Sequence, residues 1–131
     1  MNTSWMNHYT KKFADENLET DTQIKFDYNE MKKSCEDIIN ELNKSFEKNQ
    51  SNCRAIYNNE KNEFVFPDNV KLCFEYLNND TVIKFKGFYN GECRDEFEIT
   101  INPQNNKYRY YNENFDSLYK LMNKILSEIL K

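Results

Sequence analysis

Polar and apolar residues alternate along residues 70–111, and Asn, Asp, Gly and Pro residues interrupt the alternation at intervals. Alternation with a period of two is typical of a strand with one buried face, and such interruptions mark the turns between strands. The stretch therefore predicts a meander of four antiparallel strands. Two shorter strand-like segments, residues 53–57 and 63–66, precede it and predict a hairpin.

The first turn of the meander fixes a register that can be tested, because a slip of one residue turns every side chain to the opposite face. With a two-residue turn at residues 79–80, Phe74 pairs with Phe85 and Glu75 pairs with Lys84. Apolar side chains then face apolar ones, and an acid faces a base. Asn and Asp also tolerate the positive φ that this kind of turn requires.

The second turn contains an Asn-Gly dipeptide, which is typical of a two-residue hairpin loop. Such a loop would set Phe85 opposite Glu96, whereas a loop of odd length, residues 90–92 or 89–91 with a bulge at the glycine, sets Phe85 opposite Phe97. Turning a large apolar side chain into water costs about 1.5–3 kcal/mol. One cross-strand pair contributes only about 0.2–1 kcal/mol. We therefore expect the odd loop.

Amphipathic helices are predicted on both sides of these strands. Asp27 and Glu30 have the spacing of a capping box, so a helix should begin near Tyr28 and end near residues 48–50. Its apolar stripe recurs at intervals of four, three, four and four residues: Met31, Cys35, Ile38, Leu42 and Phe46. A second stripe covers residues 115–129, and Asn112 or Asn114 is its expected N-cap.

The element order of helix, hairpin, meander and helix predicts an α+β fold. We expect an antiparallel sheet of five to six strands, a hairpin plus a four-strand meander, with N- and C-terminal amphipathic helices packed on one face. That face carries Phe74, Phe85 and Phe97, and the opposite, charged face is left open. Residues 1–23 should form an N-terminal arm or short helix, and residues 24–131 a single domain.

Length, composition and net charge limit the classes of protein to which the chain can belong. With 131 residues the chain can bury a sizeable core as one domain. A charged fraction of 31% and a mean hydropathy of −0.99 argue against a membrane span. The N-terminus has no apolar segment typical of a secretory signal, so we expect a cytoplasmic protein. A net charge of −4 disfavours a general nucleic-acid binder.

No motif for catalysis, metal binding or nucleotide binding is recognisable. The single histidine, His8, lies in the N-terminal segment, and the four cysteines include no C-x-x-C pair, so we interpret them as small buried or half-buried thiols. The predicted register sets Glu96 opposite Lys86 and Glu98 opposite Lys84, which indicates a ladder of charge pairs rather than two catalytic acids. We expect no enzymatic activity, no metal and no cofactor.

A small acidic chain with an open sheet face of mixed charge is typical of electrostatically guided protein recognition. We therefore expect a non-enzymatic protein-binding module, foremost a small inhibitor that occludes a partner's surface. The partner could be a nuclease or a toxin, as for toxin-immunity proteins and anti-defence proteins of phages or mobile elements. Monomer and homodimer both stay open. The expected partner-binding residues are Glu75, Lys84, Lys86, Arg94, Glu96, Glu98 and Tyr111 on the open face and Trp5 in the N-terminal segment.

Two alternatives stay open at this point. The order of residues 95–111 followed by 115–126 is similar to that of RWD-type domains in kinetochore and ubiquitin-pathway adaptors. That resemblance implies a scaffold subunit of a larger complex. Separately, the aromatic residues of segment 108–111, together with Lys84, Lys86 and Phe88, could stack and hold single-stranded bases. The acids interleaved on that face would repel phosphate.

Overall fold

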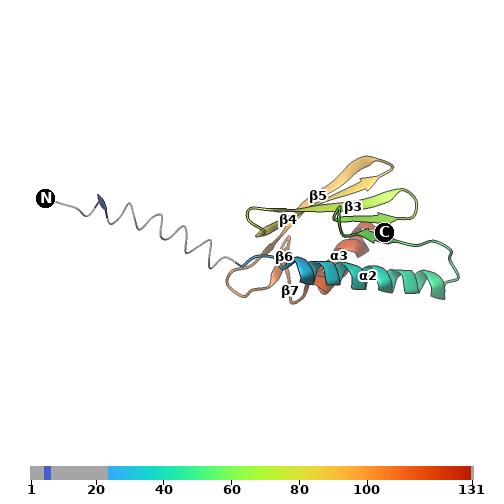
Figure 1. Cartoon of the computed structure of the whole chain (residues 1–131), viewed down its shortest axis with the longest axis horizontal. Helices are drawn as coiled ribbons and strands as arrows, with labels where there is room; N and C mark the ends of the chain where they lie inside the picture. The colour runs from blue at the N-terminus through green and yellow to red at the C-terminus, as the bar shows by residue number, and fades with distance from the viewer. Residues whose placement is uncertain (1–4, 7–23, 131) are drawn as a thin grey trace.

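The computed structural model describes residues 5–6 and 24–130. Within 24–130, two helices and one antiparallel sheet of seven strands form an α+β fold (Figure 1). The strands lie in the sheet in chain order. The α+β class is confirmed, and the sheet has more strands than the predicted five to six. The elements are α2 (Tyr28–Lys48), β1 (Ile56–Asn58), β2 (Glu63–Phe66), β3 (Val70–Leu77), β4 (Val82–Tyr89), β5 (Glu92–Ile101), β6 (Tyr108–Tyr110), β7 (Glu113–Phe115) and α3 (Leu118–Ile129).

The register of the central strands is the predicted one. Phe85 of β4 lies between Phe74 of β3 and Phe97 of β5, and the rings of Phe85 and Phe97 stack with their centroids 5.2 Å apart. In the first turn, Asn79 and Asp80 have φ values of 54° and 66°, as a two-residue turn of this kind requires. The hydrophobic pattern was therefore sufficient to phase three neighbouring strands.

The second turn reaches this register by a different route from the one predicted. Its loop has two residues, Asn90 and Gly91, both with positive φ, so the predicted odd loop is wrong. The extra residue lies inside β5 instead. Gly87 pairs with Asp95 while the next residue of β4 pairs with Cys93, so Arg94 is left without a partner across the strands. A bulge of this kind restores the phase that the two-residue loop alone would lose.

The first long helix begins and ends as predicted. Asp27 is its N-cap, and the Asp27 carboxylate accepts hydrogen bonds from the backbone N–H groups of Asn29 at 2.9 Å and Glu30 at 3.3 Å. These bonds satisfy two of the donors that a helix leaves free at its N-terminus. The helix continues to Lys48, so α2 is the element that the sequence specified most completely.

The second long helix begins later than predicted. Its N-cap is Ser117, whose hydroxyl accepts from the N–H of Lys120, so the caps predicted at Asn112 and Asn114 are wrong. Residues 113–115 form β7 instead, paired with β6. Tyr111, with a φ of 53°, turns the chain between these two strands. A three-residue strand is too short to show a recognisable alternation.

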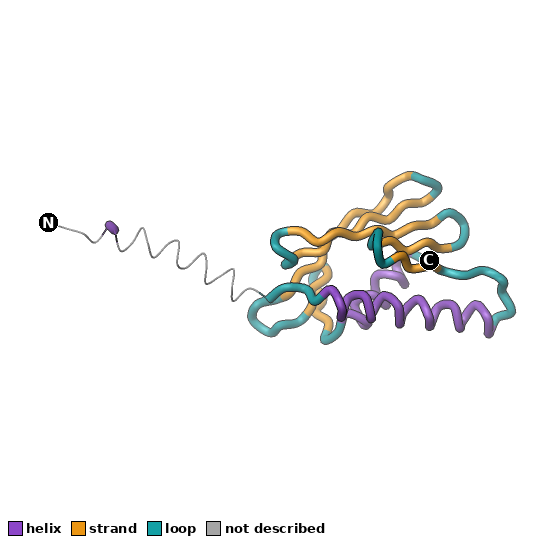
Figure 2. Tube along the Cα trace, in the orientation of Figure 1, coloured by secondary structure: helices purple, strands orange, loops and turns teal. Residues whose placement is uncertain are grey.

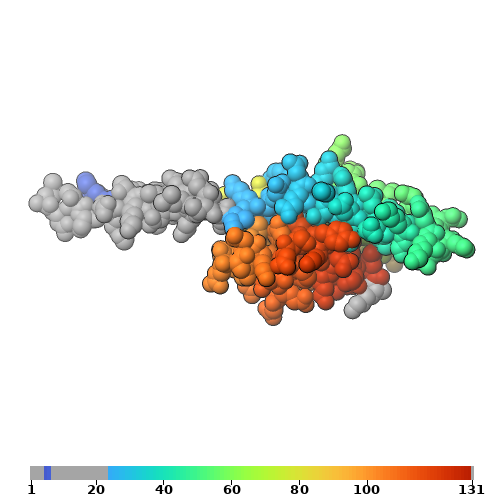
Figure 3. Space-filling model, turned by 90° about the horizontal axis from the view of Figure 1, so that it is seen from below, coloured from blue at the N-terminus to red at the C-terminus, as the bar shows by residue number. Residues whose placement is uncertain are grey.

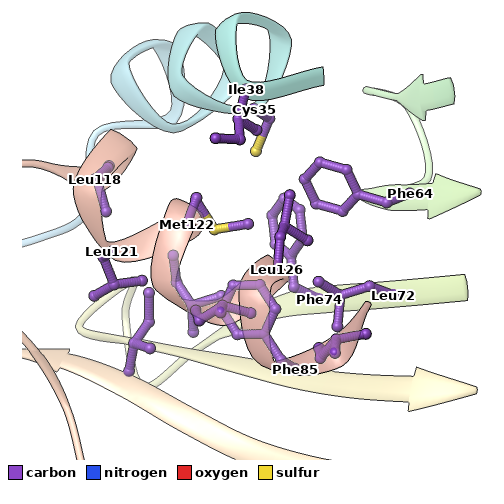
Figure 4. Packing of buried hydrophobic residues seen from close by; sticks show 14 of the residues in the cluster. Cys35, Ile38, Phe64, Leu72, Phe74, Phe85, Leu118, Leu121, Met122 and Leu126 are labelled. Atoms are coloured by element: carbon purple, nitrogen blue, oxygen red, sulfur yellow. The ribbon is translucent and has the colours of Figure 1, made fainter. Parts of the chain in front are cut away.

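The core lies between the sheet and the helices. Figure 4 shows side chains of α2 and α3 meeting Phe64, Phe74 and Phe85 of the sheet. The fully buried side chains come from every layer: Phe64, Phe85, Met31, Leu72, Ile83, Ile99, Leu118, Leu121, Met122, Ile125 and Cys35. Both helices therefore cover the same, apolar face of the sheet.

The placement of the helices differs in detail from the predicted one, in which both helices pack on the face that carries Phe74, Phe85 and Phe97. α2 and α3 lie side by side and approach each other more extensively than either approaches a strand (Figure 3). The sheet twists, and β6 and β7 run down beside the helices (Figure 2). Neither helix in this part of the chain combines the length and the apolar composition needed to cross a membrane.

Polar side chains join the sheet to the helices around the margin of the core. The Tyr108 hydroxyl donates to Glu30 Oε1 of α2 at 3.1 Å, and the Tyr110 hydroxyl donates to Glu128 of α3. Burial and the neighbouring Glu30 carboxylate raise the pKa of Tyr108 to about 12. The pKa of Tyr110 is raised as well, first by burial and then by its bond to Glu128. Two tyrosines of β6 therefore face the helices.

A buried asparagine closes the β1 end of the sheet against α2. Asn43 Nδ2 donates to the Ala55 carbonyl oxygen at 3.0 Å, and the Ala55 N–H donates to Asn43 Oδ1 at 2.8 Å. Both residues are buried, with 8% and 3% of their surface exposed. The side-chain amide thus acts as a strand would, satisfying a backbone donor and acceptor just before β1.

Candidate functional site

Neither helix lies over the opposite side of the central sheet, which we call the open face. In register order, charged residues predominate in the middle rows, and apolar residues lie at the two ends of the strands, beside Lys71 at one end and Thr100 at the other. The face comprises Glu63 and Val65 of β2, Lys71, Cys73, Glu75 and Leu77 of β3, Val82, Lys84, Lys86 and Phe88 of β4, and Glu96, Glu98 and Thr100 of β5. Five of the eight predicted contact residues lie together here: Glu75, Lys84, Lys86, Glu96 and Glu98.

The ion pair between Lys84 and Glu96 on the open face runs diagonally across the strands. The backbone sets Lys84 opposite Glu98, as predicted, but Lys84 Nζ lies 2.6 Å from Glu96 Oε1. Their hydrogen bond and the attraction between the two charges raise the pKa of Lys84 and lower the pKa of Glu96. Glu96 therefore forms its ion pair with the diagonal lysine, and Lys86, its neighbour in the register, adds a weaker attraction that also lowers the pKa of Glu96.

The bulge in β5 removes Arg94 from the open face. The Arg94 guanidinium carbon lies 5.8 Å from the centroid of the Tyr89 ring, and Arg94 Nη2 lies 3.5 Å from Glu92 Oε2. Tyr89 packs against the core, on the helix side of the sheet. The prediction that Arg94 belongs with the open-face residues is therefore wrong, because the extra residue of a bulge shifts the alternation.

Tyr111 also leaves the open face. Its strand register would set it opposite Glu98, but its positive φ ends β6 and turns the ring toward Tyr110 and Phe97, at centroid distances of 4.6 and 6.5 Å. Both of these neighbours lie on the helix side of the sheet. With 66% of its surface exposed, Tyr111 is open to solvent at a different margin of the molecule from the one predicted.

The predicted contact residue of the N-terminal segment, Trp5, is described by the structure and has 62% of its surface exposed. Residues 7–23 of the predicted arm or short helix, His8 among them, lie outside the described residues. The prediction that this segment reaches a partner therefore stays a prediction.

The open face is hollowed around Phe88, a feature that the sequence did not reveal. One hollow has a volume of 280 Å³ and is lined by Glu63, Asn69, Lys71, Cys73, Phe88 and Gly91. A second, of 240 Å³, is lined by Cys73, Phe74, Glu75, Lys84, Lys86 and Phe88. Because Cys73 and Phe88 line both, the two hollows adjoin. The pairing of Lys71 with Phe88 could have been read from the strand register, but the hollow itself depends on side-chain packing.

A further hollow, of 350 Å³, lies in the helix layer between α2 and α3. Leu42, Tyr119 and Leu130 line it, and the last two each have 37% of their surface exposed. Its lining includes none of the predicted contact residues, and it supplies a surface against which the open face can be compared.

Asp95 has a structural role on the helix side of the sheet. It lies against Gly87, where an added Cβ would be 3.2 Å from Asp95 Cβ. The Tyr89 hydroxyl donates to Asp95 Oδ2 at 2.7 Å and lies 3.1 Å from the Ile129 carbonyl oxygen. Burial and this carboxylate raise the pKa of Tyr89 to about 12. Asp95 therefore orients the Tyr89 hydroxyl, which lies beside the C-terminal end of α3.

The cysteines are placed less uniformly than predicted. Cys35 is buried, and burial raises the pKa of its thiol to about 12. Cys73 is half-buried, whereas Cys53 and Cys93 are exposed, so the prediction of buried or half-buried thiols is wrong for these two. Among residues 24–130, no three His, Cys, Asp or Glu side chains are grouped as a metal site would require. Cys73 donates to Glu63 Oε2 at 3.7 Å, and burial followed by this carboxylate raises its pKa.

The open face is thus a surface of mixed character. It combines alternating charges, apolar ends and a shallow hollow, all on strands held in register by the core. Comparisons with known protein families, with curated proteins and with solved structures found no match in any of the three.

Proposed function

We propose that the chain is a non-enzymatic protein-binding module that inhibits a partner protein by covering part of its surface. The observation that carries the proposal is the open face itself, which neither α2 nor α3 covers. Exposure alone is ordinary, since antiparallel sheets commonly keep one face in water. The apolar side chains at both ends of this face are less ordinary, because solvent-facing strand positions are usually polar.

Two apolar groups flank the charged rows. Val65 and Phe88 lie toward one end of the strands, and Leu77 and Val82 lie opposite each other at the other end. All four are only half-buried, and none packs against the core. A partner that covered them would gain the burial of apolar area, and the charged rows between them would fix its orientation.

The proposed mode of action is occlusion. Strands β3, β4 and β5 are paired along most of their length, so the face is rigid before it meets a partner, which lowers the entropy lost on binding. A rigid surface that covers a functional region of a toxin or nuclease would inhibit it in a one-to-one complex. This is the action of toxin-immunity proteins and of anti-defence proteins from phages and mobile elements.

The alternative of single-stranded nucleic-acid binding loses much of its support. It relied on the aromatic residues of segment 108–111 lying beside Lys84 and Lys86. Tyr108 and Tyr110 instead donate to carboxylates of the helices, and Tyr111 turns to the helix side. Phe88 is the aromatic residue left on the open face among residues 63–100. A single ring offers little for stacking successive bases.

The proposal is tested by capturing a protein partner on the immobilised chain and then locating the contact. We expect the double variant Lys84→Gln/Lys86→Glu to weaken binding at least tenfold. The matched control, Lys25→Gln/Lys33→Glu, makes the same two changes at exposed positions in and before α2, and it should leave binding unchanged. Melting temperatures of both variants are measured to show that each is folded.

Three results would contradict the proposal. The first is a partner that binds the open-face variant as tightly as the original chain, which would direct attention to Trp5. The second is retention on a single-stranded nucleic-acid column that salt abolishes. The third is turnover of any substrate.

A further inference from the structure

We propose that the hollow around Phe88 is the anchor point of the open face and that it receives an apolar side chain from an acidic segment of the partner. This inference rests on the proposed function and specifies its chemistry. The sequence pattern placed the centre of the contact in the charged rows. The structure shifts it toward one apolar end of the strands.

Phe88 is the feature around which the hollow is built. Lys71 lies directly opposite it on β3, and Lys86 precedes it by two residues on β4, so both lysines share its face. Phe88 is half-buried and does not belong to the core. An aromatic ring bracketed by two long cationic side chains can accept an apolar group from above while the lysines contact acids on either side.

The charges on this part of the face favour an acidic occupant. Glu96 is engaged by Lys84 at 2.6 Å, and neither Lys71 nor Lys86 has a carboxylate within ion-pair distance among residues 24–130. The two hollows together are lined by three lysines and two glutamates, and Lys84 is already matched by Glu96, so the charges of the lining balance. Position favours an acidic occupant: the two lysines without an ion pair are the ones that flank Phe88, whereas Glu63 accepts from the Cys73 thiol and Glu75 lies farther along the strands, opposite Lys84.

The position of the hollows suits a side chain that projects from a partner. Their volumes are 280 and 240 Å³, and they adjoin on the outer surface of the sheet, beside the charged residues that a partner would contact at the same time. Protein interfaces commonly place a single buried anchor residue in a pocket of this kind, surrounded by contacts that exclude water.

The rim of the hollow is fixed before binding. Asn69 and Gly91 line it from two separate turns, and the N–H of Asn90 donates to the carbonyl oxygen of Asn69 at 3.0 Å. The turn residues have the positive φ values that their tight geometry requires. One turn therefore braces the other, and the anchor site needs no rearrangement to accept a side chain.

The test uses two synthetic peptides and the full-length chain labelled with ¹⁵N. The acidic probe is acetyl-Asp-Glu-Leu-Phe-Glu-Asp-amide, and the basic probe replaces its four acids with lysine. We expect the acidic probe to shift the amide resonances of Lys71, Phe88 and Gly91, with a dissociation constant at least tenfold lower than that of the basic probe. Lys71→Glu/Lys86→Glu should weaken the acidic probe at least tenfold, and Phe88→Ala should abolish the shifts.

The matched control is Lys33→Glu/Lys48→Glu, which reverses two exposed charges of α2 and should not change the affinity of the probe. Equal affinity for both probes, or shifts confined to the hollow between α2 and α3, would overturn the inference. Binding of a captured partner to the variants distinguishes the proposed anchor site from the proposed open-face contact. If it is insensitive to Phe88→Ala but sensitive to Lys84→Gln/Lys86→Glu, the anchor site is refuted and the open-face function stands. Insensitivity to both refutes the two together.

Discussion

Replacing Asn43 with alanine gives the most direct test of how the sheet is joined to α2. The Asn43 side chain makes two hydrogen bonds to Ala55, one as donor and one as acceptor, at 3.0 and 2.8 Å. Alanine keeps the helix but removes both bonds. It leaves a buried N–H and a buried carbonyl of Ala55 without partners, since Ala55 has only 3% of its surface exposed.

The expected cost follows from the number of groups left unpaired. A buried donor or acceptor without a partner costs about 1–3 kcal/mol, so two such groups set an upper range of about 2–6 kcal/mol. Alanine recovers a few tenths of a kcal/mol as the better helix former, up to about 0.7 kcal/mol. Partial entry of water into the vacated space lowers the cost further. We therefore expect Asn43→Ala to reduce the free energy of unfolding by about 2–4 kcal/mol.

Urea denaturation followed by circular dichroism measures this change. The control is Asn40→Ala, because Asn40 is exposed on the same helix and its replacement carries the same gain in helix propensity without a lost bond. The difference between the two variants isolates the contribution of the Ala55 bonds. A difference below about 1 kcal/mol, the net value of a single bond, would refute the reasoning.

Three further predictions follow from other contacts. Gly87→Ala should lower the unfolding free energy by about 1–3 kcal/mol, because its Cβ would meet Asp95 Cβ at 3.2 Å; unchanged urea denaturation would contradict this. NMR titration should give Glu96 a pKa below its ordinary 4.5, and Lys84→Gln should restore it. The pKa of Glu96 is lower in the folded chain than in the unfolded chain, so the Lys84–Glu96 pair stabilises the fold above pH 4.5. This contribution is lost as the pH falls through the folded-state pKa of Glu96. Cys35 should resist iodoacetamide until the chain is unfolded in urea; alkylation in the native state would show that the core opens.

The register was predictable because each face of a strand can be checked against its neighbours. Phe74, Phe85 and Phe97 allowed only one phase once acids were also required to face bases. The capping of α2 by Asp27 was predictable for a similar reason, because it depends on residues within a few positions of one another.

The features that were missed depend on local backbone geometry or on distant contacts. The bulge at Arg94 and the turn at Tyr111 each moved one predicted contact residue to the other side of the sheet, since a single unpaired or left-handed residue breaks the alternation. Asn43 lies within an apolar stripe, and nothing near it in the sequence indicates Ala55, twelve residues away, as its partner. The hollow at Phe88 likewise needs strands β2 to β4 to be assembled before it exists.

Footprinting of the complex with a captured partner is the measurement that addresses the central claim most directly. Carbodiimide labelling of carboxylates, read by mass spectrometry, compares Glu75 and Glu98 of the open face with Glu41 beside the hollow of the helix layer. If the open face is the contact surface, the two strand glutamates become protected when the partner binds and Glu41 remains labelled. Protection of Glu41 alone, with Glu75 and Glu98 still reactive, would mean that the partner docks on the helices.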